Sequence, residues 1–297
     1  MSDNNTPESC DGNCKTCANA NNCDDPQNTM KGNLPEKALV DVKHVILVLS
    51  GKGGVGKSTV AANLAFALSN HGYNTGIIDL DIHGPDIPKM LGVEEHKLQS
   101  YDGKIIEPVR ITGTLATVSM AFLLPDKATP VIWRGPMKST AIKQFLEDVK
   151  WGELDFLVID LPPGTGDEAL TIAQLAPNID GAVIVTTPQD VAVLDSSKAV
   201  TFIQKINLKV LGIVENMSGF ICPKCGEELD LFGKGGGEKA AKDLNVPFLG
   251  SIPIDIEMRK AGDEGRPLII RRDSSENATW KAIDNVMESL IAQVEKN

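Results

Sequence analysis

A phosphate-binding loop is encoded by the stretch "GKGGVGKS", which begins at Gly51 and ends at Ser58. It satisfies the pattern G-x-x-x-x-G-K-[ST], whose glycines let backbone N–H groups turn towards phosphate oxygens. Ser58 opens the following predicted helix, where its hydroxyl can bind Mg²⁺. A glycine-rich turn without a ligand is the alternative, and the specificity of the motif argues against it. The candidate nucleotide-binding residues are Gly51, Lys52, Gly53, Gly54, Val55, Gly56, Lys57, Ser58 and Thr59.

Acidic residues end two further apolar runs. The run "FLVIDLPPGTGDE" places Asp160 at the end of a predicted buried strand, the position of a Walker B carboxylate. The run "GIIDLDIHGPDIP" places Asp79 and Asp81 at the end of another. Because the carboxyl ends of parallel strands face the ligand crevice, one of these two can orient or deprotonate an attacking water. A helix-capping or structural role is the alternative, and it has more weight for Asp79 than for Asp81.

Two of the six cysteines, Cys222 and Cys225, form the knuckle "CPKCG", in which Pro and Gly can bend both sulfurs towards one metal. Two thiolates are half of a tetrahedral site. No third cysteine lies nearby and the four histidines all precede residue 97, so one domain alone cannot easily complete the site. A two-fold dimer presents the pair twice, which is enough for a bridging [4Fe-4S] cluster. Zinc and a redox-active CxxC are the alternatives.

The other four cysteines lie in a polar N-terminal segment: Cys10, Cys14, Cys17 and Cys23. Their spacing, C-x3-C-x2-C-x5-C, is dense enough to hold a second cluster or a zinc ion. Residues 1–40 have almost no apolar clusters, so we expect a flexible tail unless a metal orders it. Residues 41–297 are predicted to form the domain that carries the phosphate-binding loop.

Seven short apolar runs separated by helical patterns predict the elements that position these residues. The runs are "HVILVLS", "NTGIIDLD", "TLATVSM", "FLVIDLP", "GAVIVTTP", "KVLGIVEN" and "PFLGSIP". They are nearly continuous rather than alternating, which indicates strands buried on both faces. Helical patterns cover residues 58–72, 191–207 and 236–245, and a closing amphipathic helix with a Ser cap is expected within 274–297. The order predicts an α/β fold, a doubly wound and mostly parallel sheet with helices on both faces. The stretch "DGKIIEPVRIT" is expected to form an inserted hairpin.

Composition excludes some classes of partner. The chain has 297 residues, 42% of them hydrophobic, and a formal charge of -11, so its overall field repels nucleic acid and anionic lipid. No uninterrupted apolar window is long enough to span a membrane, and the N-terminus lacks the features of a secretion signal. We therefore expect a cytoplasmic protein with no membrane or nucleic-acid partner.

Taken together, several motifs carry a family resemblance. These are "GKGGVGKST", "DLDIHGPDIP", "WRGPM", "DLPPGTGDE", "TTPQDVAVLD", "ENMSGFICPKC" and "GSIPID". In this order they are similar to the Mrp/ApbC group of P-loop iron-sulfur cluster carriers, which is related to the nitrogenase iron protein and to MinD. The resemblance implies a P-loop NTPase of the deviant Walker A type that binds ATP or ADP with Mg²⁺ and hydrolyses ATP slowly. It also implies a homodimer that transfers a [4Fe-4S] cluster to apoproteins.

The resemblance also implies roles for single residues. Lys52 corresponds to the signature lysine that crosses a dimer interface to the partner's nucleotide, although the loop pattern alone favours a solvated lysine. Asp81 corresponds to the water-activating carboxylate, Asp160 to the Mg²⁺-linked carboxylate, and Asn216 and Pro253 to contacts on the adenine side. Many members of the group lack a cysteine tail, and the eukaryotic cytosolic relatives have one with a longer first gap. The roles of Arg134 and His83 are not assigned.

Two other functions are compatible with the sequence. One is a MinD- or ParA-like positioning ATPase, for which the C-terminal amphipathic stretch would be the membrane anchor. That stretch carries more acidic than basic residues, whereas membrane-surface helices are usually basic. The other is an ATP-gated electron donor that keeps its cluster through redox cycles.

Overall fold

A computed structural model describes residues 37–82, 84–101, 104–124, 135–222, 224–266 and 278–296. The chain divides into the units Met1–Glu36 and Lys37–Asn297, and every described residue belongs to the second. Some residues singled out by the sequence lie outside the described part: Cys10, Cys14, Cys17, Cys23, His83 and Arg134. The predictions about the tail cysteines therefore stay predictions.

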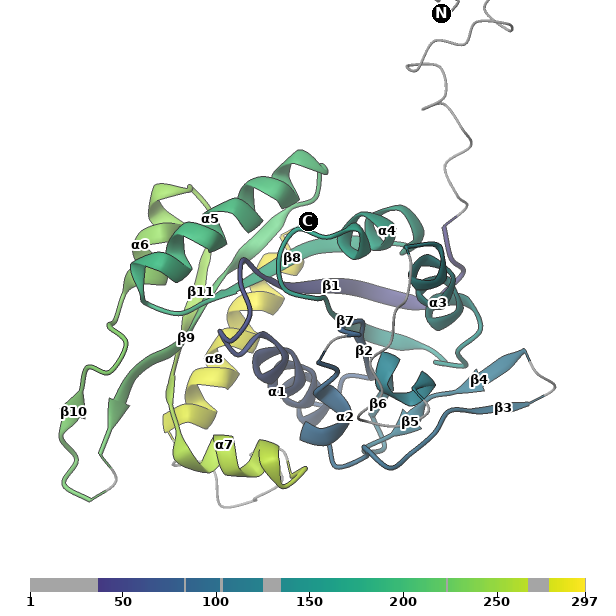
Figure 1. The fold of residues 1–297 in the computed structure, drawn as a ribbon, viewed down its shortest axis with the longest axis horizontal. Coiled ribbons are helices and arrows are strands. Elements are labelled where there is room, and N and C mark those ends of the chain that lie inside the picture. The colour runs from purple at the N-terminus through teal and green to yellow at the C-terminus, as the bar shows by residue number, and fades with distance from the viewer. Residues whose placement is uncertain are drawn as a thin grey trace, which may run out of the picture. The chain divides into compact units, whose positions relative to one another are not determined.

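Nine strands of the described residues form one mostly parallel sheet (Figure 1). They are β1 (Val42–Ser50), β2 (Thr75–Asp79), β5 (Val109–Arg110), β6 (Leu115–Ser119), β7 (Leu154–Asp160), β8 (Ile179–Thr186), β9 (Val210–Ile221), β10 (Glu228–Leu229) and β11 (Phe248–Ile254). The strand order is β10-β9-β8-β1-β7-β2-β6-β5, and β11 also pairs with β9. Among the described strands of this sheet, only the β9/β10 and β5/β6 pairs are antiparallel. All seven predicted strands are confirmed.

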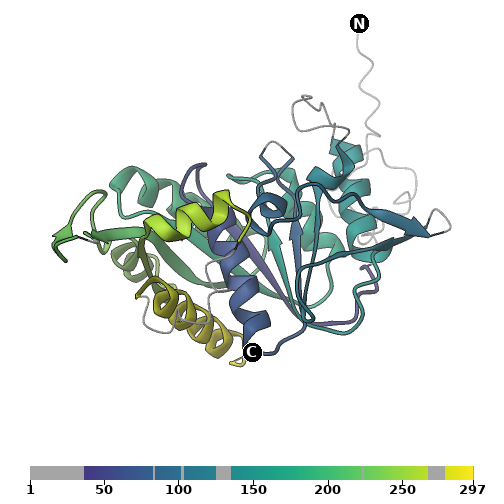
Figure 2. The same cartoon turned by 90° about the horizontal axis from the view of Figure 1, so that it is seen from below.

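Helices cover both faces of the sheet (Figure 2). On one face, α3 (Gly135–Glu147), α4 (Asp167–Leu175), α5 (Asp190–Lys205) and α6 (Gly236–Asp243) pack on the apolar side chains of the strands. On the other face the core is closed by α1 (Lys57–Asn70), α2 (Ile87–Met90) and α8 (Ala278–Val294). A short 3₁₀ helix follows β6 at Met120–Leu123, and α7 (Ile256–Asp263) packs against α2. The sheet is therefore doubly wound, as the near-continuous apolar runs predicted.

The hairpin expected in "DGKIIEPVRIT" lies earlier in the chain, so that this stretch supplies only one of its two strands. Within this stretch β4 (Ile105–Glu107) and β5 are separated only by the buried Pro108. One residue cannot reverse the chain, because the shortest common hairpin loop has two. Instead, β4 pairs with the preceding β3 (Gln99–Tyr101), and β5 pairs with β6 at the edge of the main sheet.

The predicted closing helix is α8, and its apolar face is buried. Ile283, Val286, Met287, Leu290 and Val294 point into the core, where α8 packs against β11 and α1. Its expected Ser cap lies outside the described residues. Among the helices that the structure describes, none has the length and apolar character needed to cross a membrane.

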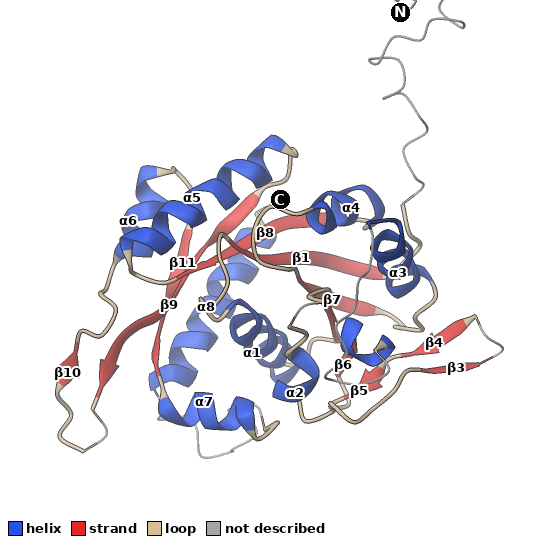
Figure 3. Cartoon of the chain, viewed as in Figure 1, coloured by secondary structure: helices blue, strands red, loops and turns tan. Residues whose placement is uncertain are grey.

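Strand β9 is longer than its sequence pattern predicted. The pattern ends at Asn216, whereas the strand continues to Ile221 and turns back into β10 (Figure 3). Met217 and Gly219 adopt positive φ angles of 58° and 72° within this extension. The extension connects the carboxyl edge of the sheet to the cysteine pair.

Candidate nucleotide site and cysteine hairpin

The phosphate-binding loop connects β1 to α1, and two of its glycines are required by close contacts. A Cβ on Gly51 would lie 2.2 Å from the carbonyl oxygen of Asp195 in α5. Gly56 has a φ of +79°, and a Cβ there would lie 2.2 Å from Nδ2 of Asn216. That amide nitrogen donates a hydrogen bond to the Val55 carbonyl at 2.9 Å. The loop is thus held from both sides, by α5 and by β9.

Lys57 and Asp160 form a buried ion pair beneath this loop. Lys57 Nζ lies 2.5 Å from Asp160 Oδ1, and it also donates to Ser58 Oγ at 3.2 Å. The Lys57 side chain is 6% exposed and that of Asp160 is not exposed. Burial raises the pKa of Asp160, and the Lys57 cation opposes this shift. The predicted P-loop lysine and Walker B carboxylate are therefore brought together.

The residues at this point fit a magnesium ion. Within the described residues, Asp160 Oδ2 is buried and has no hydrogen-bond partner. The Ser58 hydroxyl is close by, since both residues contact Lys57 Nζ. Carboxylate and hydroxyl oxygens are hard donors of the kind Mg²⁺ prefers. Ser58 and Asp160 would hold the ion, which would neutralise phosphate charge when bound.

The two carboxylates that follow β2 differ in their surroundings. Asp79 is fully buried and pairs in register with Asp160 on β7. Its Oδ2 accepts from Ser119 Oγ at 2.9 Å, and its Oδ1 accepts from the Asp81 backbone N–H at 3.1 Å. Burial, together with the charge of Asp160, raises the pKa of Asp79 well above its ordinary value. Asp81 lies in the loop above, where its Oδ1 accepts from the Gly84 N–H at 3.2 Å.

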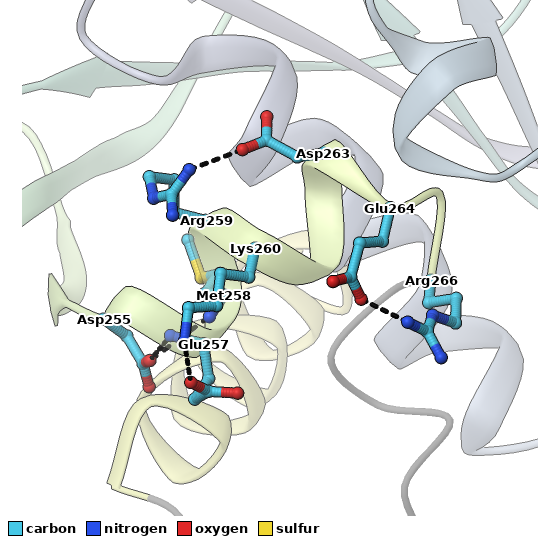
Figure 4. A network of polar contacts seen from close by, with 8 residues as sticks. All are labelled: Asp255, Glu257, Met258, Arg259, Lys260, Asp263, Glu264 and Arg266. Carbon is cyan, nitrogen blue, oxygen red and sulfur yellow. Dashed lines mark hydrogen bonds and ion pairs between the residues drawn. The ribbon is translucent and has the colours of Figure 1, made fainter.

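A pocket of about 390 Å³ lies beside the first turns of α1. Asn216 and Pro253, which the resemblance assigns to the adenine side, both line it, together with Thr59 and Asn63 of α1. Helix α7 forms one wall, in which Arg259 pairs with Asp263 and Asp255 caps the helix (Figure 4). Adjacent to the loop, this pocket has space for a nucleoside. The candidate site thus consists of the phosphate-binding loop and a neighbouring pocket.

Lys52 is half-buried at the rim of the loop, where its carbonyl accepts a hydrogen bond from Ser50 Oγ at 2.9 Å. In the part of the chain that the structure describes, no carboxylate forms an ion pair with its ammonium. The Lys57 ammonium, in contrast, is paired with the Asp160 carboxylate. The two lysines of the motif therefore have different environments.

Cys222 and Cys225 lie in the turn between β9 and β10. The Cys222 N–H donates to the Glu227 carbonyl, and the Gly226 N–H donates to the Cys222 carbonyl, both at 2.8 Å. Gly226 has a φ of +75°, which the turn requires. Backbone N–H groups of Cys225 and Lys224 lower the pKa of the Cys222 thiol. The turn thus already stabilises a thiolate.

The thiolate pair is not completed by other ligands nearby. Among the residues that the structure describes, no group of three or more His, Cys, Asp or Glu side chains is arranged to hold a metal. Cys222 is half-buried and Cys225 is exposed. The described part of one chain therefore presents two cysteine side chains in this turn, and their role as half of a four-thiolate site stays a prediction.

Sequence reasoning missed Glu215, the residue before Asn216. Glu215 is fully buried, and its carboxylate accepts from the N–H groups of Gly235 at 2.9 Å and Gly237 at 2.5 Å, and from Ser218 Oγ at 2.5 Å. It ties the start of α6 to β9 just before the cysteine hairpin. An acidic residue inside the apolar run "KVLGIVEN" was the available signal, because a buried carboxylate needs hydrogen-bond donors.

The doubly wound sheet, the loop between β1 and α1 and the buried lysine-carboxylate pair define a P-loop NTPase, a class of nucleotide hydrolases. A family model described as "NUBPL iron-transfer P-loop NTPase" matches residues 41–291. The chain belongs to this family, which confirms the resemblance drawn from the motifs.

Individual relatives agree with this assignment. The chain is 50% identical over 283 residues to an iron-sulfur cluster carrier protein of Methanocaldococcus jannaschii, covering 95% of this chain and 97% of the relative. It is 50% identical over 238 residues to the cytosolic Fe-S cluster assembly factor CFD1 of Candida glabrata, covering 78% and 84%. A nucleotide-binding protein from Archaeoglobus fulgidus, solved with ADP, superposes with a TM-score of 0.67 at 40% identity, covering 81% and 91%.

Proposed function

We propose that this protein is an ATP-binding and slowly ATP-hydrolysing carrier that receives a [4Fe-4S] cluster and transfers it to apoproteins. The observation that carries the proposal is the thiolate knuckle at Cys222 and Cys225, which lies six residues beyond Asn216 on the strand that supports the phosphate-binding loop. Family membership and the names of the relatives support the same function.

The cluster is the cargo, and a second copy of the chain completes its site. Two thiolates cannot close a four-thiolate site, and an isologous dimer supplies the same pair twice. Lys52 supports the same arrangement, because it is half-buried in the loop and has no ion pair among the described residues, whereas Lys57 is paired with Asp160. In such a dimer Lys52 reaches the partner's nucleotide, as an arginine finger does. The acceptors are apo iron-sulfur proteins.

Nucleotide binding and the cysteine pair are connected through β9. Phosphate at the loop competes with Asp160 for the Lys57 ammonium, since the two are alternative anions for one buried cation. Val55 in the loop is bonded to Asn216, and Cys222 follows β9 directly. A change in the loop is thus carried to the cysteine hairpin, where it alters how the two copies hold the cluster.

The positioning-ATPase hypothesis placed a membrane anchor in the C-terminal helix. The apolar face of α8 is instead occupied by the core, as the burial of Ile283, Met287 and Leu290 indicates. This helix therefore lends no support to membrane cycling. A cytoplasmic location fits the proposed work on apoproteins. The second cluster or zinc proposed for the tail cysteines is a separate question, because it concerns residues outside the described part.

The test is anaerobic reconstitution with iron and sulfide of the full chain and of a variant with Cys222→Ser and Cys225→Ser. A bridging cluster predicts that the double variant loses about two irons per chain and forms fewer dimers. Transfer to an apo acceptor should then respond to ATP in the wild type and not in Lys57→Ala. The four tail cysteines are unchanged in both proteins, so any iron they hold cancels in the comparison.

Three results would contradict the proposal. Unchanged iron in the double variant would place the cluster elsewhere, and binding of zinc alone would make the knuckle structural. Repeated reduction and reoxidation without loss of cluster to acceptors would favour an electron donor.

A further inference from the structure

Asp79 and Asp81 are neighbours in sequence, yet the structure gives them different tasks. Asp79 ends β2 between two partner strands, with Ser119 opposite it on β6 and Asp160 opposite it on β7. Both of its carboxylate oxygens are engaged, one by the Ser119 hydroxyl and one by the Asp81 backbone N–H. Both oxygens of this fully buried carboxylate are thus already used in hydrogen bonds, in contrast to the Oδ2 of the equally buried Asp160, which has no partner among the described residues.

The hydrogen bond from the Asp81 N–H to Asp79 holds the Asp81 backbone in place. Its N–H lies 3.1 Å from Asp79 Oδ1, and its own carboxylate closes a turn by accepting from the Gly84 N–H. Asp79 is in turn fixed, because Ser119 Oγ donates to it while accepting from the Ala121 N–H at 3.0 Å. A chain of hydrogen bonds therefore runs from the end of β6 through Asp79 to the start of the Asp81 loop.

We infer that Asp79 is a positioning residue for ATP hydrolysis, which sets the place of Asp81 by accepting its backbone N–H. The inference rests on the proposed role of Asp81 as the carboxylate that orients the attacking water. What matters in Asp79 is an acceptor atom at the Oδ1 position, not a negative charge. Asparagine has the same shape and keeps that acceptor. Asp79→Asn should therefore retain ATP hydrolysis, whereas Asp79→Ala should not.

The experiment compares Asp79→Ala and Asp79→Asn in the full chain, measuring kcat and KM for ATP, the Kd of a fluorescent ATP analogue, and amide hydrogen exchange at Asp81. We expect Asp79→Ala to lower kcat about tenfold to a hundredfold, because displacement of a catalytic group by about 1 Å has this effect. The Kd should change less than about threefold, since the phosphate loop is untouched. Asp79→Asn should retain kcat and the protection of the Asp81 amide.

Asp180 provides a control at the amino end of β8, the end of the strand that is remote from the phosphate-binding loop. Its Oδ2 accepts the Val45 backbone N–H at 3.1 Å, which is again a bond from a backbone N–H to a carboxylate, although this one joins the neighbouring strands β1 and β8. Asp180→Ala should lower the unfolding temperature without changing kcat. A general loss of stability would change kcat in both alanine variants alike. Comparison of the two variants therefore distinguishes a positioning role of Asp79 from a role in packing.

Each outcome decides the inference. A wild-type kcat in Asp79→Ala would overturn the inference. A loss of kcat in Asp79→Asn would also overturn it, because that result would show that the negative charge of Asp79 matters. If Asp79→Ala does not fold, Asp79→Asn still decides, because loss of kcat or of Asp81 protection would overturn the inference. A wild-type kcat in Asp81→Asn would contradict the proposed role of Asp81 itself, which is a distinct failure.

Discussion

The ammonium of Lys57 lies 2.5 Å from Asp160 Oδ1, although 103 residues separate the two in the chain. Lys57 begins α1, which follows β1 and the loop, and β1 pairs with β7, the strand that ends at Asp160. The lysine that is expected to bind phosphate is thus held by the carboxylate that is expected to face the metal. Removal of either partner would leave the other charge buried without its counter-charge.

Lys57→Ala should lower the free energy of unfolding by about 3 kcal/mol, because it leaves the Asp160 carboxylate buried without its cation. It should also abolish binding of ATP. Urea unfolding and equilibrium titration measure the two effects. The control is Lys43→Ala, which breaks the Lys43–Asp155 pair of 2.7 Å at the surface and should have little effect, because exposed pairs contribute little. Equal effects of both substitutions would contradict the prediction.

Gly56→Ala should be more damaging than Gly54→Ala. Both glycines have φ near +80°, so each alanine is strained by about 1 kcal/mol. Only at Gly56 would the added Cβ meet another group, Nδ2 of Asn216, and displace it from the Val55 carbonyl. Thermal unfolding and ATP titration of the two variants isolate this contact. Because Asn216→Ala removes the group that the new Cβ would meet, adding it to Gly56→Ala should restore part of the lost stability. No restoration would contradict the prediction.

The Cys222 thiol should ionise at lower pH than an ordinary cysteine, whose pKa is near 9.0, because backbone N–H groups stabilise its thiolate. A lowered pKa means that the thiolate is already present at pH values where a free thiol is still protonated. Alkylation of metal-free, reduced protein, followed by peptide mass spectrometry, should therefore show Cys222 reacting at lower pH. The control is the same protein unfolded in urea, where the turn is lost. An identical pH profile of Cys222 alkylation in the folded and unfolded protein would contradict the prediction.

Lys52 should act on the nucleotide of the partner subunit. Neither Lys52→Ala nor Asp81→Asn should hydrolyse ATP alone. A one-to-one mixture should recover about a quarter of wild-type activity, because half of the dimers are mixed and each has one intact site if the lysine acts in trans. Steady-state hydrolysis after subunit exchange measures this. Lys52→Ala mixed with Lys52→Ala,Asp81→Asn is the control, and it should stay inactive. No recovery in the first mixture would place Lys52 in its own site.

Local patterns were sufficient for the seven apolar strands, for four of the helices and for the phosphate loop. The run "HVILVLS" predicts β1 because a strand buried on both faces needs apolar residues at nearly every position, and the seven runs of this kind are all strands. The helices α1, α5, α6 and α8 also follow from their patterns. The short helices α2 and α7 do not, because α2 has four residues and α7 buries none, so neither shows a clear apolar period.

The sequence by itself determined the fold class from the order of its apolar runs, and it determined the loop with its two lysines, the carboxylate of β7 and the cysteine knuckle from short local motifs. Only the tertiary structure decided which side chains meet. It placed Asn216 against Val55, used Glu215 to hold the start of α6, and separated the buried Asp79 from Asp81 in the loop above. The first two contacts join residues that are 161 and 22 positions apart in the chain. Their geometry depends on strand order and register, which no local pattern specifies.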